Sequence, residues 1–525
     1  QASDTSLKFV VPATSKPGVY AYRLNDTAVG LLNRPRIHWL QGDDGVQARP
    51  GGRLDLFGVN LGGDGAIVRL QGAQTRRLKA ASAACRLTVT LPADLPLGDY
   101  QVQAHSGLGG PQAWSRPLRL TVARPETWPT KVYNVRDLGA EGVGERDDAP
   151  VIQAALDAAG QAGGGIVLLP RGRYVVTGTL TIPPRTVLRG DSAADTCLCW
   201  PDTDEPPKEM IRGTNRFAVE DLTVYAANHQ HVIVGDTGDK PDAGHIALRR
   251  VVIRANAYRG HLKEEQVDQR FRASLKLSTG GGDSIRAGGP DVVIEDCDVL
   301  GSGRAIYLSR VTGGRVTGCR LANGRWGWYC LSGSSGLVVE NNQIVGADLM
   351  STGGGLNCLD GSNASENVYY AGNKVGMMHG WDRESMTSDA GGGPYIGGIV
   401  KADGTALTLA SEPKWDRDWS GAGVFFLDGK GAGQVRRLAK HSGAEITLDR
   451  PLDVAPDATT VITITQYQGH YLLLGNEFAD CGAVQFYGTA IENVVAGNRG
   501  QRMSGFSAWA LWYHEIGRAS CRERV

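Results

Sequence analysis

The residues best suited to chemistry are concentrated in one polar run at positions 377–393, MMHGWDRESMTSDAGGG. Within 11 residues this run holds a histidine, an arginine, a tryptophan and three carboxylates. Hydrolysis of a glycosidic bond needs two carboxyl groups, one as general acid and the other as base or nucleophile. We therefore predict Glu384 and Asp389 as the first catalytic candidates, followed by Asp360 and then Asp382. A charged surface loop with internal ion pairs is the alternative interpretation of this run.

An aromatic residue or a carboxylate stands near a polar residue in four other short segments of similar pattern. These segments are 304–309 (RAIYLS), 325–330 (RWGWYC), 357–361 (NCLDG) and 484–488 (VQFYG). Aromatic rings stack on sugar faces, and a few polar or charged groups fix the orientation of a bound ligand. The predicted substrate-binding residues are Tyr307, Arg325, Trp326, Tyr329, His379, Trp381, Arg383 and Tyr487.

A second chemistry is compatible with the same residues. A polysaccharide lyase removes a proton beside a uronate carboxylate with a basic or phenolic side chain, while Ca²⁺ or arginine neutralises the acid. The residues that would serve a lyase are Arg325, Tyr329, His379, Arg383 and Tyr487. Glu295, Asp296 and Asp298 would hold Ca²⁺ in that case, although an ordinary polar turn is the favoured interpretation. No other cofactor or metal is predicted.

The elements that must position these residues form a repeat. One inward position recurs in short strand-like segments, at Leu222, Val251, Cys297, Cys319, Asn342, Asn373, Asn476 and Asn498. Three of the intervals are 22 or 23 residues long, which is one coil of a solenoid. Stacked asparagine side chains can hydrogen-bond along a ladder, and cysteine fits the same small slot. We therefore predict a parallel β-helix and assign the asparagines a structural role.

A helix signal precedes the repeat. Asp147 or Asp148 can cap a helix with Pro150 in its first turn, and an apolar face follows over residues 151–159. Such a helix would cover the open end of a β-helix, where apolar core and strand edges are exposed. The run from Tyr133 through GGGIVLLP at 163–170 resembles the N-terminal signature of the pectate-lyase-like superfamily. That resemblance implies an all-β, right-handed parallel β-helix among polysaccharide hydrolases, lyases and phage tailspikes.

The chain divides into three predicted parts and a tail. Residues 1–124 are predicted to form an immunoglobulin-like β-sandwich, which a Pro-containing linker at 123–130 joins to a β-helix over 131–514. The alternating pattern at about 395–467 indicates a small inserted β-domain. Residues 515–525 match the translation of a common sequencing adapter, so we predict a non-native tail on a gene from environmental DNA.

Charge and hydropathy limit the partners. Lys plus Arg and Asp plus Glu both total 55, so no net charge draws the chain to nucleic acid or an anionic membrane. No run of about 18 apolar residues is present. The chain starts at Gln1 without methionine, which is compatible with a processed, secreted or periplasmic bacterial protein. The expected partner is a polysaccharide or oligosaccharide; the sequence does not distinguish a monomer from a homo-oligomer.

Three functions are consistent with the sequence. The first is a glycoside hydrolase, the second a polysaccharide lyase acting on a uronate-containing chain, and the third a non-catalytic adhesin or tailspike-like sugar-binding protein. Polygalacturonase activity itself is not expected, because Trp381 stands where the Gly-His-Gly stretch of those enzymes has its second glycine. The only Asp-Asp pairs, at 43–44 and 147–148, lie outside the repeat.

Overall fold

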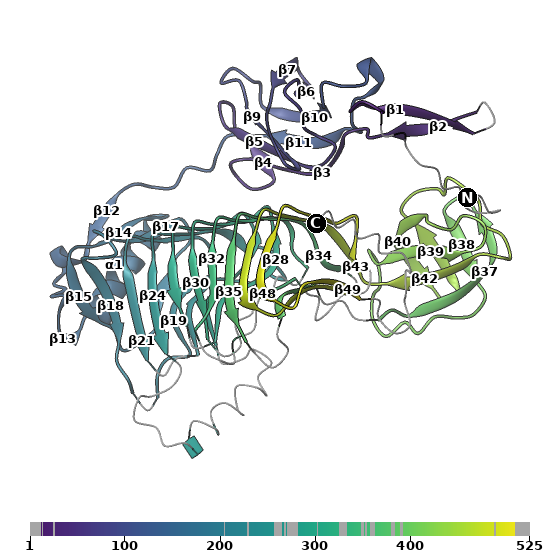
Figure 1. The fold of residues 1–525 in the computed structure, drawn as a ribbon. Helices are drawn as coiled ribbons and strands as arrows, with labels where there is room; N and C mark the ends of the chain where they lie inside the picture. The colour runs from purple at the N-terminus through teal and green to yellow at the C-terminus, as the bar shows by residue number, and fades with distance from the viewer. Residues whose placement is uncertain are drawn as a thin grey trace.

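The computed structural model of the 525-residue chain shows a β-helix, a β-sandwich and a small barrel (Figure 1). The structure describes residues 12, 14–24, 27–203, 205–227, 230–256, 265–266, 269, 282–301, 303–324, 333–347, 351, 354–356, 363–379, 384–388, 392–487 and 490–509.

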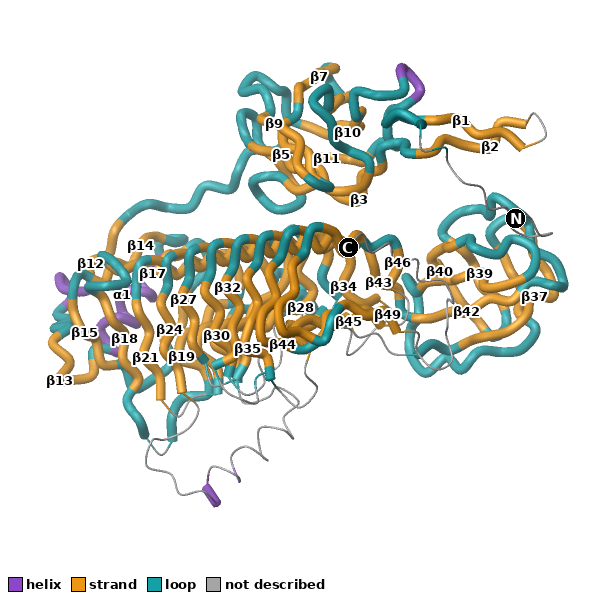
Figure 2. Tube along the Cα trace, in the orientation of Figure 1, coloured by secondary structure: helices purple, strands orange, loops and turns teal. Residues whose placement is uncertain are grey.

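Three faces of parallel strands make up the β-helix, and most coils of the described residues supply one strand to each face in turn (Figure 2). Face 1 consists of β12 (Val132–Asn134), β14 (Gly165–Leu169), β17 (Thr186–Gly190), β20 (Asn215–Glu220), β23 (Gly244–Arg249), β26 (Val292–Glu295), β29 (Arg315–Thr317), β31 (Ser335–Glu340), β34 (Asn363–Ala371), β43 (Tyr467–Leu474), β46 (Ala490–Ile491) and β47 (Val494–Ala496). Face 2 consists of β13 (Val143–Asp147), β15 (Gly172–Val175), β18 (Thr196–Trp200), β21 (Thr223–Ala227), β24 (Val252–Asn256), β27 (Asp298–Leu300), β30 (Arg320–Asn323), β32 (Gln343–Gly346), β35 (Lys374–Met378), β44 (Glu477–Cys481) and β48 (Arg499–Met503).

Face 3 carries those of the predicted segments that lie within the described residues: 304–309, 384–388 and 484–487. It consists of β16 (Leu180–Ile182), β19 (Glu209–Gly213), β22 (His231–Val234), β25 (Asp283–Pro290), β28 (Arg304–Thr312), β33 (Gly354–Gly355), β36 (Glu384–Ser388), β45 (Ala483–Tyr487) and β49 (Phe506–Trp509). Its first five strands join face 1 in a 17-stranded sheet, and its last four form a separate sheet. The strands β28, β36 and β45, which bear three of the predicted segments, therefore share one face.

The predicted asparagine ladder is confirmed. The Nδ2 groups of Asn342, Asn373 and Asn476 each donate to the Oδ1 of the next ladder asparagine, ending at Asn498, at 2.8–3.0 Å. The residue before each ladder position has a left-handed backbone: Asp221, Arg250, Asp296, Gly318, Asn341, Gly372, Gly475 and Gly497, with φ between 52° and 66°. Asparagine, aspartate and glycine tolerate this conformation best, which accounts for most residues at this turn.

Helix α1 (Ala149–Gln161) lies over the first coil and buries Ile152, Ala155, Leu156 and Ala159 against the core (Figure 1). Asp148 occupies the capping position, but its carboxylate accepts from the N–H groups of Glu141 and Gly142. The Oδ1 of Asp147 instead accepts from the Ala149 N–H at 3.0 Å. Asp147 therefore caps the helix, and Asp148 closes the turn that precedes it.

A β-sandwich precedes the β-helix. Its sheets are β3 (Arg36–Gln41), β5 (Arg53–Val59), β9 (Arg86–Thr90) and β8 (Ala81–Ala83) on one side, and β4 (Gln47–Ala48), β11 (Leu118–Val122), β10 (Gly98–His105), β6 (Ile67–Gln71) and β7 (Thr75–Lys79) on the other. A hairpin of β1 (Tyr20–Leu24) and β2 (Thr27–Leu32) extends from it. Buried residues of both sheets form one core, while immunoglobulin-like topology stays a prediction.

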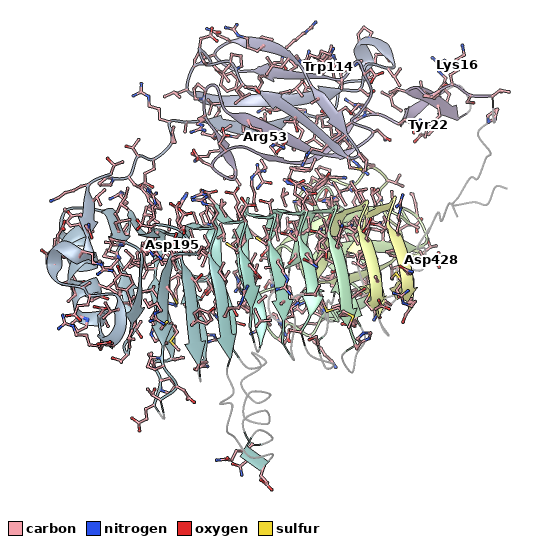
Figure 3. All side chains as sticks on the ribbon, turned by 60° about the vertical axis from the view of Figure 1, so that its left-hand side comes forward. Lys16, Tyr22, Arg53, Trp114, Asp195 and Asp428 are labelled. Carbon is pink, nitrogen blue, oxygen red and sulfur yellow. The ribbon has the colours of Figure 1, made fainter. Side chains whose placement is uncertain are left out.

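The sandwich packs on face 1 of the β-helix, above its middle and last coils (Figures 1 and 3). Trp39 and Phe57 stack at 4.6 Å between ring centroids, and Phe57 contacts Tyr369 of β34. Arg86 Nη1 lies 2.9 Å from Glu340 Oε2, with both side chains less than a fifth exposed. This interface combines an apolar centre with shielded ion pairs, so it holds the two parts in a fixed relation.

A closed six-stranded barrel is inserted between β36 and β43. Its strands are β37 (Tyr395–Asp403), β38 (Ala406–Leu409), β41 (Glu445–Leu448), β40 (Val435–Ser442), β39 (Gly423–Asp428) and β42 (Val461–Thr465), in hydrogen-bonded order. Buried side chains including Trp419, Phe426 and Ile464 fill its interior. The barrel thus has its own core, and β34 still pairs directly with β43 across the insertion.

Candidate binding cavity on face 3

Two rows of side chains run across the strands of face 3 because consecutive coils pair in register. One row contains Arg212, Val234, Arg286 and Tyr307 on β19, β22, β25 and β28. The second contains Glu209, His231, Asp283 and Arg304 on the same strands. Neighbouring strands lie about 4.8 Å apart, so these rows bring charged groups from four coils together.

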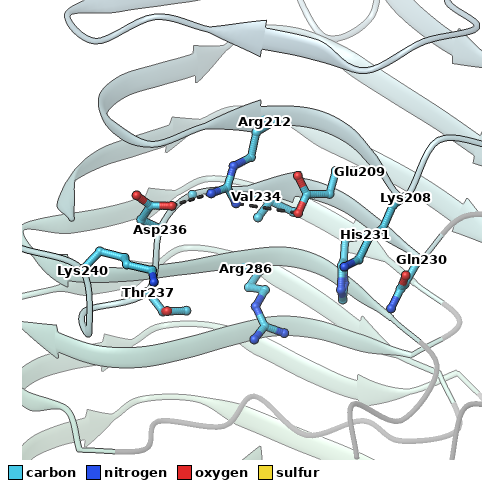
Figure 4. A pocket seen from close by; sticks show the side chains of 11 residues that line it. Lys208, Glu209, Arg212, Gln230, His231, Val234, Asp236, Thr237, Lys240 and Arg286 are labelled. Atoms are coloured by element: carbon cyan, nitrogen blue, oxygen red, sulfur yellow. Dashed lines mark hydrogen bonds and ion pairs between the residues drawn. The ribbon is translucent and has the colours of Figure 1, made fainter. Parts of the chain in front are cut away.

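A cavity of about 350 Å³ lies over these rows (Figure 4). Its lining is formed by Lys208, Glu209, Arg212, Gln230, His231, Val234, Gly235, Asp236, Thr237, Lys240 and Arg286. Four of these side chains are lysine or arginine and two are carboxylates, so the lining carries an excess of positive charge. A volume in this range is typical of sites for small ligands or single sugar units.

Arg212 is held in place by carboxylates on both sides. Its guanidinium forms an ion pair with Asp236 and lies 3.7 Å from Glu209 Oε1 (Figure 4). Such pairing fixes the orientation of the planar group before a ligand arrives, and a fixed guanidinium can bind a carboxylate in bidentate geometry. Arg212 is therefore prepared to bind an anion.

A buried carboxylate organises the other half of the cavity. Asp283 is fully buried, and its oxygens accept from Arg304 Nε at 2.6 Å and Arg286 Nη1 at 3.1 Å. Both guanidiniums also lie over the ring of Tyr307, at 4.4 Å for Arg286 and 4.5 Å for Arg304. Asp283 thus compensates one positive charge, and the two arginines together remain net cationic beside the phenol.

His231 is a neutral hydrogen-bond donor in this arrangement. Burial lowers the pKa of His231 to about 4, and the charges of Arg286 and Arg304 act in the same direction. The Asp283 N–H donates to His231 Nδ1 at 3.1 Å, which leaves the proton of the neutral ring on Nε2. His231 therefore offers an N–H to a ligand oxygen without adding a charge.

Only part of the predicted site lies within the described residues. Tyr307 is on β28, half-buried beside the cavity, whereas Glu384 on β36 is buried and its Oε1 accepts from Gln485 at 3.3 Å. Glu384 is three coils from Tyr307, a separation of about 14 Å, so the structure does not bring them together. His379 is exposed directly after β35 on face 2.

The remaining predictions stay predictions. The residues outside the described part of the chain are Arg325, Trp326, Tyr329, Asp360, Trp381, Asp382, Arg383 and Asp389, and the side chain of Tyr487 is also undescribed. In the predicted Ca²⁺ run, Glu295 lies 3.2 Å from Arg249 and Asp298 lies 3.2 Å from Arg320. Arginines therefore engage these carboxylates on faces 1 and 2, away from the cavity.

The polar side chains that line this cavity were not predicted from the sequence. Lys208, Arg212, His231, Lys240 and Arg286 were not among the predicted residues. A signal was present in the pattern Met-Ile-Arg at 210–212, Ser-Ile-Arg at 284–286 and Ala-Ile-Tyr at 305–307, which repeats an inward isoleucine followed by a cavity residue. In this pattern Arg212 and Arg286 stand at the position that Tyr307 occupies in the segment 304–309.

The fold and this cavity define a parallel β-helix protein with a cavity on one face whose lining has more cationic than anionic side chains. Residues 132–200 match the family described as rhamnogalacturonase A/epimerase, pectate lyase-like, and residues 210–375 match the right-handed β-helix region. The chain belongs to the pectate-lyase-like superfamily of right-handed β-helix proteins. On the described residues, no helix is long and apolar enough to cross a membrane.

Curated relatives are similar over a short stretch. The chain is 40% identical over 106 residues to mannuronan C5-epimerase AlgE1 of Azotobacter vinelandii, covering 18% of this chain and 8% of the relative. It is 39% identical over 105 residues to alginate lyase 7 of the same organism, covering 18% and 12%. The chain therefore spans about a tenth of the length of these relatives, which are carbohydrate-active proteins.

Solved structures are similar at low identity. The family 28 exopolygalacturonase of Yersinia enterocolitica is 12% identical, with a TM-score of 0.33 over 91% of this chain and 98% of that one. The surface adhesin PfbA of Streptococcus pneumoniae is 13% identical, with a TM-score of 0.37 over 72% of this chain and 100% of that one.

Proposed function

We propose that this protein acts on a uronate-containing polysaccharide by removing the proton beside the sugar carboxylate. The observation that carries the proposal is the register of Arg212 and Arg286 on face 3, with Lys208 on the same cavity wall. A uronate carboxylate gains negative charge when its neighbouring proton is removed, and fixed cations stabilise that charge in the transition state. The name of the curated relatives, epimerases and a lyase of uronate polymers, supports this choice.

The cavity residues have distinct roles in this proposal. Arg212, Arg286 and Lys208 bind and neutralise the carboxylate, and the Nε2–H of His231 donates to one of its oxygens. Tyr307, one strand beyond the cavity wall in the row of Arg286, exchanges the proton with the sugar carbon. In elimination the bond to the leaving sugar oxygen then breaks and a C=C bond forms, whereas in epimerisation a proton returns from the opposite face of the ring.

The hydrolase hypothesis is less well supported. It depends on Asp360, Asp382 and Asp389, which lie outside the described residues, and on Glu384, which is buried against Gln485.

A polymeric substrate is also most accessible to an exported protein, so secretion or export to the periplasm remains part of the proposal.

One assay separates the alternatives. The full chain is incubated in D₂O with polymannuronate, polygalacturonate and a neutral glucan, and reducing ends, near-ultraviolet absorbance and deuterium at C5 are recorded together. Absorbance with new reducing ends on a uronan establishes a lyase, and deuterium without chain cleavage establishes an epimerase. Reducing ends without absorbance, or binding without any chemical change, would overturn proton abstraction in favour of a hydrolase or a glycan-binding protein.

A further inference from the structure

A cluster of metal-ligating side chains lies where the sandwich meets the β-helix, far from the cavity on face 3. His38 of the sandwich and His470 and Glu492 of the β-helix place three donor atoms within 4.8 Å of one another. Two imidazoles and a carboxylate form a donor set typical of zinc and related transition metals. Two parts of the chain therefore contribute to one candidate centre.

The fold places these residues together by two devices. Asn367 in β34, His470 in β43 and Glu492 between β46 and β47 occupy equivalent left-handed positions of face 1 in three successive coils. Their φ angles are 56°, 57° and 54°, and their side chains form a column. His38 is the extra residue at a bulge in β3, where the register shifts between Ile37 and Trp39. A bulge redirects a side chain that regular pairing would place elsewhere. Here it brings His38 against His470, with ring centroids 4.1 Å apart.

The hydrogen bonds around His470 leave two acceptor atoms facing each other, an arrangement that a cation between them would satisfy. The Nδ2 of Asn367 donates to Ser335 Oγ at 3.0 Å, so its Oδ1 accepts from His470 Nδ1 at 2.9 Å. The other nitrogen, His470 Nε2, then presents a lone pair to Glu492 Oε2 at 3.1 Å. Two acceptors at this distance need a proton or a metal ion between them. An amide carbonyl that fixes the far nitrogen is also the usual support of a metal-bound histidine.

His38 supplies the second independent observation. Its Nε2 is buried and has no hydrogen-bond partner among the described residues. Glu492 faces His470 on the other side, with its Oε2 3.1 Å from His470 Nε2. Arg36 Nη1 holds its other oxygen at 2.8 Å.

We propose that His38, His470 and Glu492 bind a divalent transition metal such as Zn²⁺, which fastens the sandwich to the β-helix. Bonds of about 2.0–2.1 Å in tetrahedral geometry place ligand atoms about 3.3 Å apart. The nearly parallel imidazoles, 16° between planes, must therefore converge on the ion. Rotation about the soft terminal torsion of His38 achieves this, since that torsion has broad minima. The fourth position is open to water.

The test titrates chelator-treated full-length protein with Zn²⁺ by calorimetry and with Co²⁺ by visible absorption. The expected result is one equivalent bound, a cobalt spectrum of tetrahedral type and a higher unfolding temperature with Zn²⁺. His38→Gln and His470→Asn each weaken binding at least tenfold and remove the temperature shift. His245→Asn is the matched control, because His245 occupies the equivalent left-handed position in β23, where its Nδ1 lies 3.5 Å from Asp291 Oδ2.

Circular dichroism first establishes that each variant is folded, and Glu492→Gln provides a third variant if one is not. Absence of saturable binding to the wild-type protein overturns the proposal and assigns the space between the two acceptor atoms to a proton on His470. Binding that survives both histidine substitutions, or that is lost equally in the His245 control, overturns it as well.

Discussion

Asn373 Nδ2 donates to Asn476 Oδ1 at 3.0 Å although 103 residues separate the two in sequence. The whole barrel lies between them in the chain, and the ladder nevertheless continues from one coil to the next. Both side chains are fully buried, so each amide depends on its neighbours for hydrogen bonds.

Replacing Asn373 by alanine should therefore lower the free energy of unfolding by about 1–3 kcal/mol, because buried polar groups of Asn342 and Asn476 lose their partner. Chemical denaturation measures the change. Asn498→Ala, at the half-buried end of the ladder, should cost less. Equal losses in the two variants would show that the interior of the ladder has no special role.

Removal of Arg286 should reduce turnover of an anionic polysaccharide about ten- to a hundredfold, because a charge-assisted contact to the carboxylate is lost. The comparison of kcat/KM between wild type and Arg286→Ala measures this effect. Arg254→Ala is the control, since Arg254 pairs with Asp298 on face 2 in a similar way. A uniform loss in both variants would argue against the cavity as the site of binding.

Acid should destabilise the protein through His231. Its pKa is about 4 in the folded state and near 6.5 when exposed, so folding disfavours the protonated form. The contribution of neutral His231 to the free energy of unfolding is complete above pH 6.5. It is lost as the pH falls from about 6.5 towards 4. His231→Gln accepts the same backbone hydrogen bond but does not titrate. The free energy of unfolding should therefore fall less between pH 7 and pH 5 in the variant, and an unchanged slope would contradict this assignment.

Cys199 should be alkylated at neutral pH. It lies 3.2 Å from Cys197, Sγ to Sγ, and the hydrogen bond from the Cys197 thiol lowers the pKa of Cys199 to about 7. Mass spectrometry after iodoacetamide treatment should show a rate that rises through pH 7. In Cys197→Ala the rise should move to higher pH. Buried Cys297 should react slowly in both proteins.

The repeat itself was predictable because its signals are local. The ladder positions follow from spacing and the capping helix from capping residues and apolar periodicity, and both are confirmed. Of the two aspartates predicted as possible caps, Asp147 accepts from the helix and Asp148 closes the Glu141–Gly142 turn. Residue types and their spacing place a carboxylate near the start of the helix. They do not reveal from which backbone N–H group that carboxylate accepts a hydrogen bond.

The sites were less predictable for a physical reason. Tyr307 was predicted because its segment resembles the segments that follow it in the repeat. Arg212 and Arg286 lie in earlier coils, before the first of the aligned segments. The interdomain cluster is a different case. Arg36 and Glu492 are 456 residues apart, and only docking of one folded part on another brings them together. No periodicity within either segment carries that information.

The docking of the sandwich also sets an order of events during synthesis. Its Arg36 leaves the ribosome 456 residues before Glu492, the partner that completes the interface. At about 5–20 residues per second, this interval lasts roughly 20 to 90 s. Within this interval the apolar surface around Trp39 and Phe57 acquires its cover in steps, first from Val338 and Tyr369 and last from Leu472 and Leu474. A nascent chain of this protein therefore presents a temporary chaperone target, which disappears only when the last coils are in place.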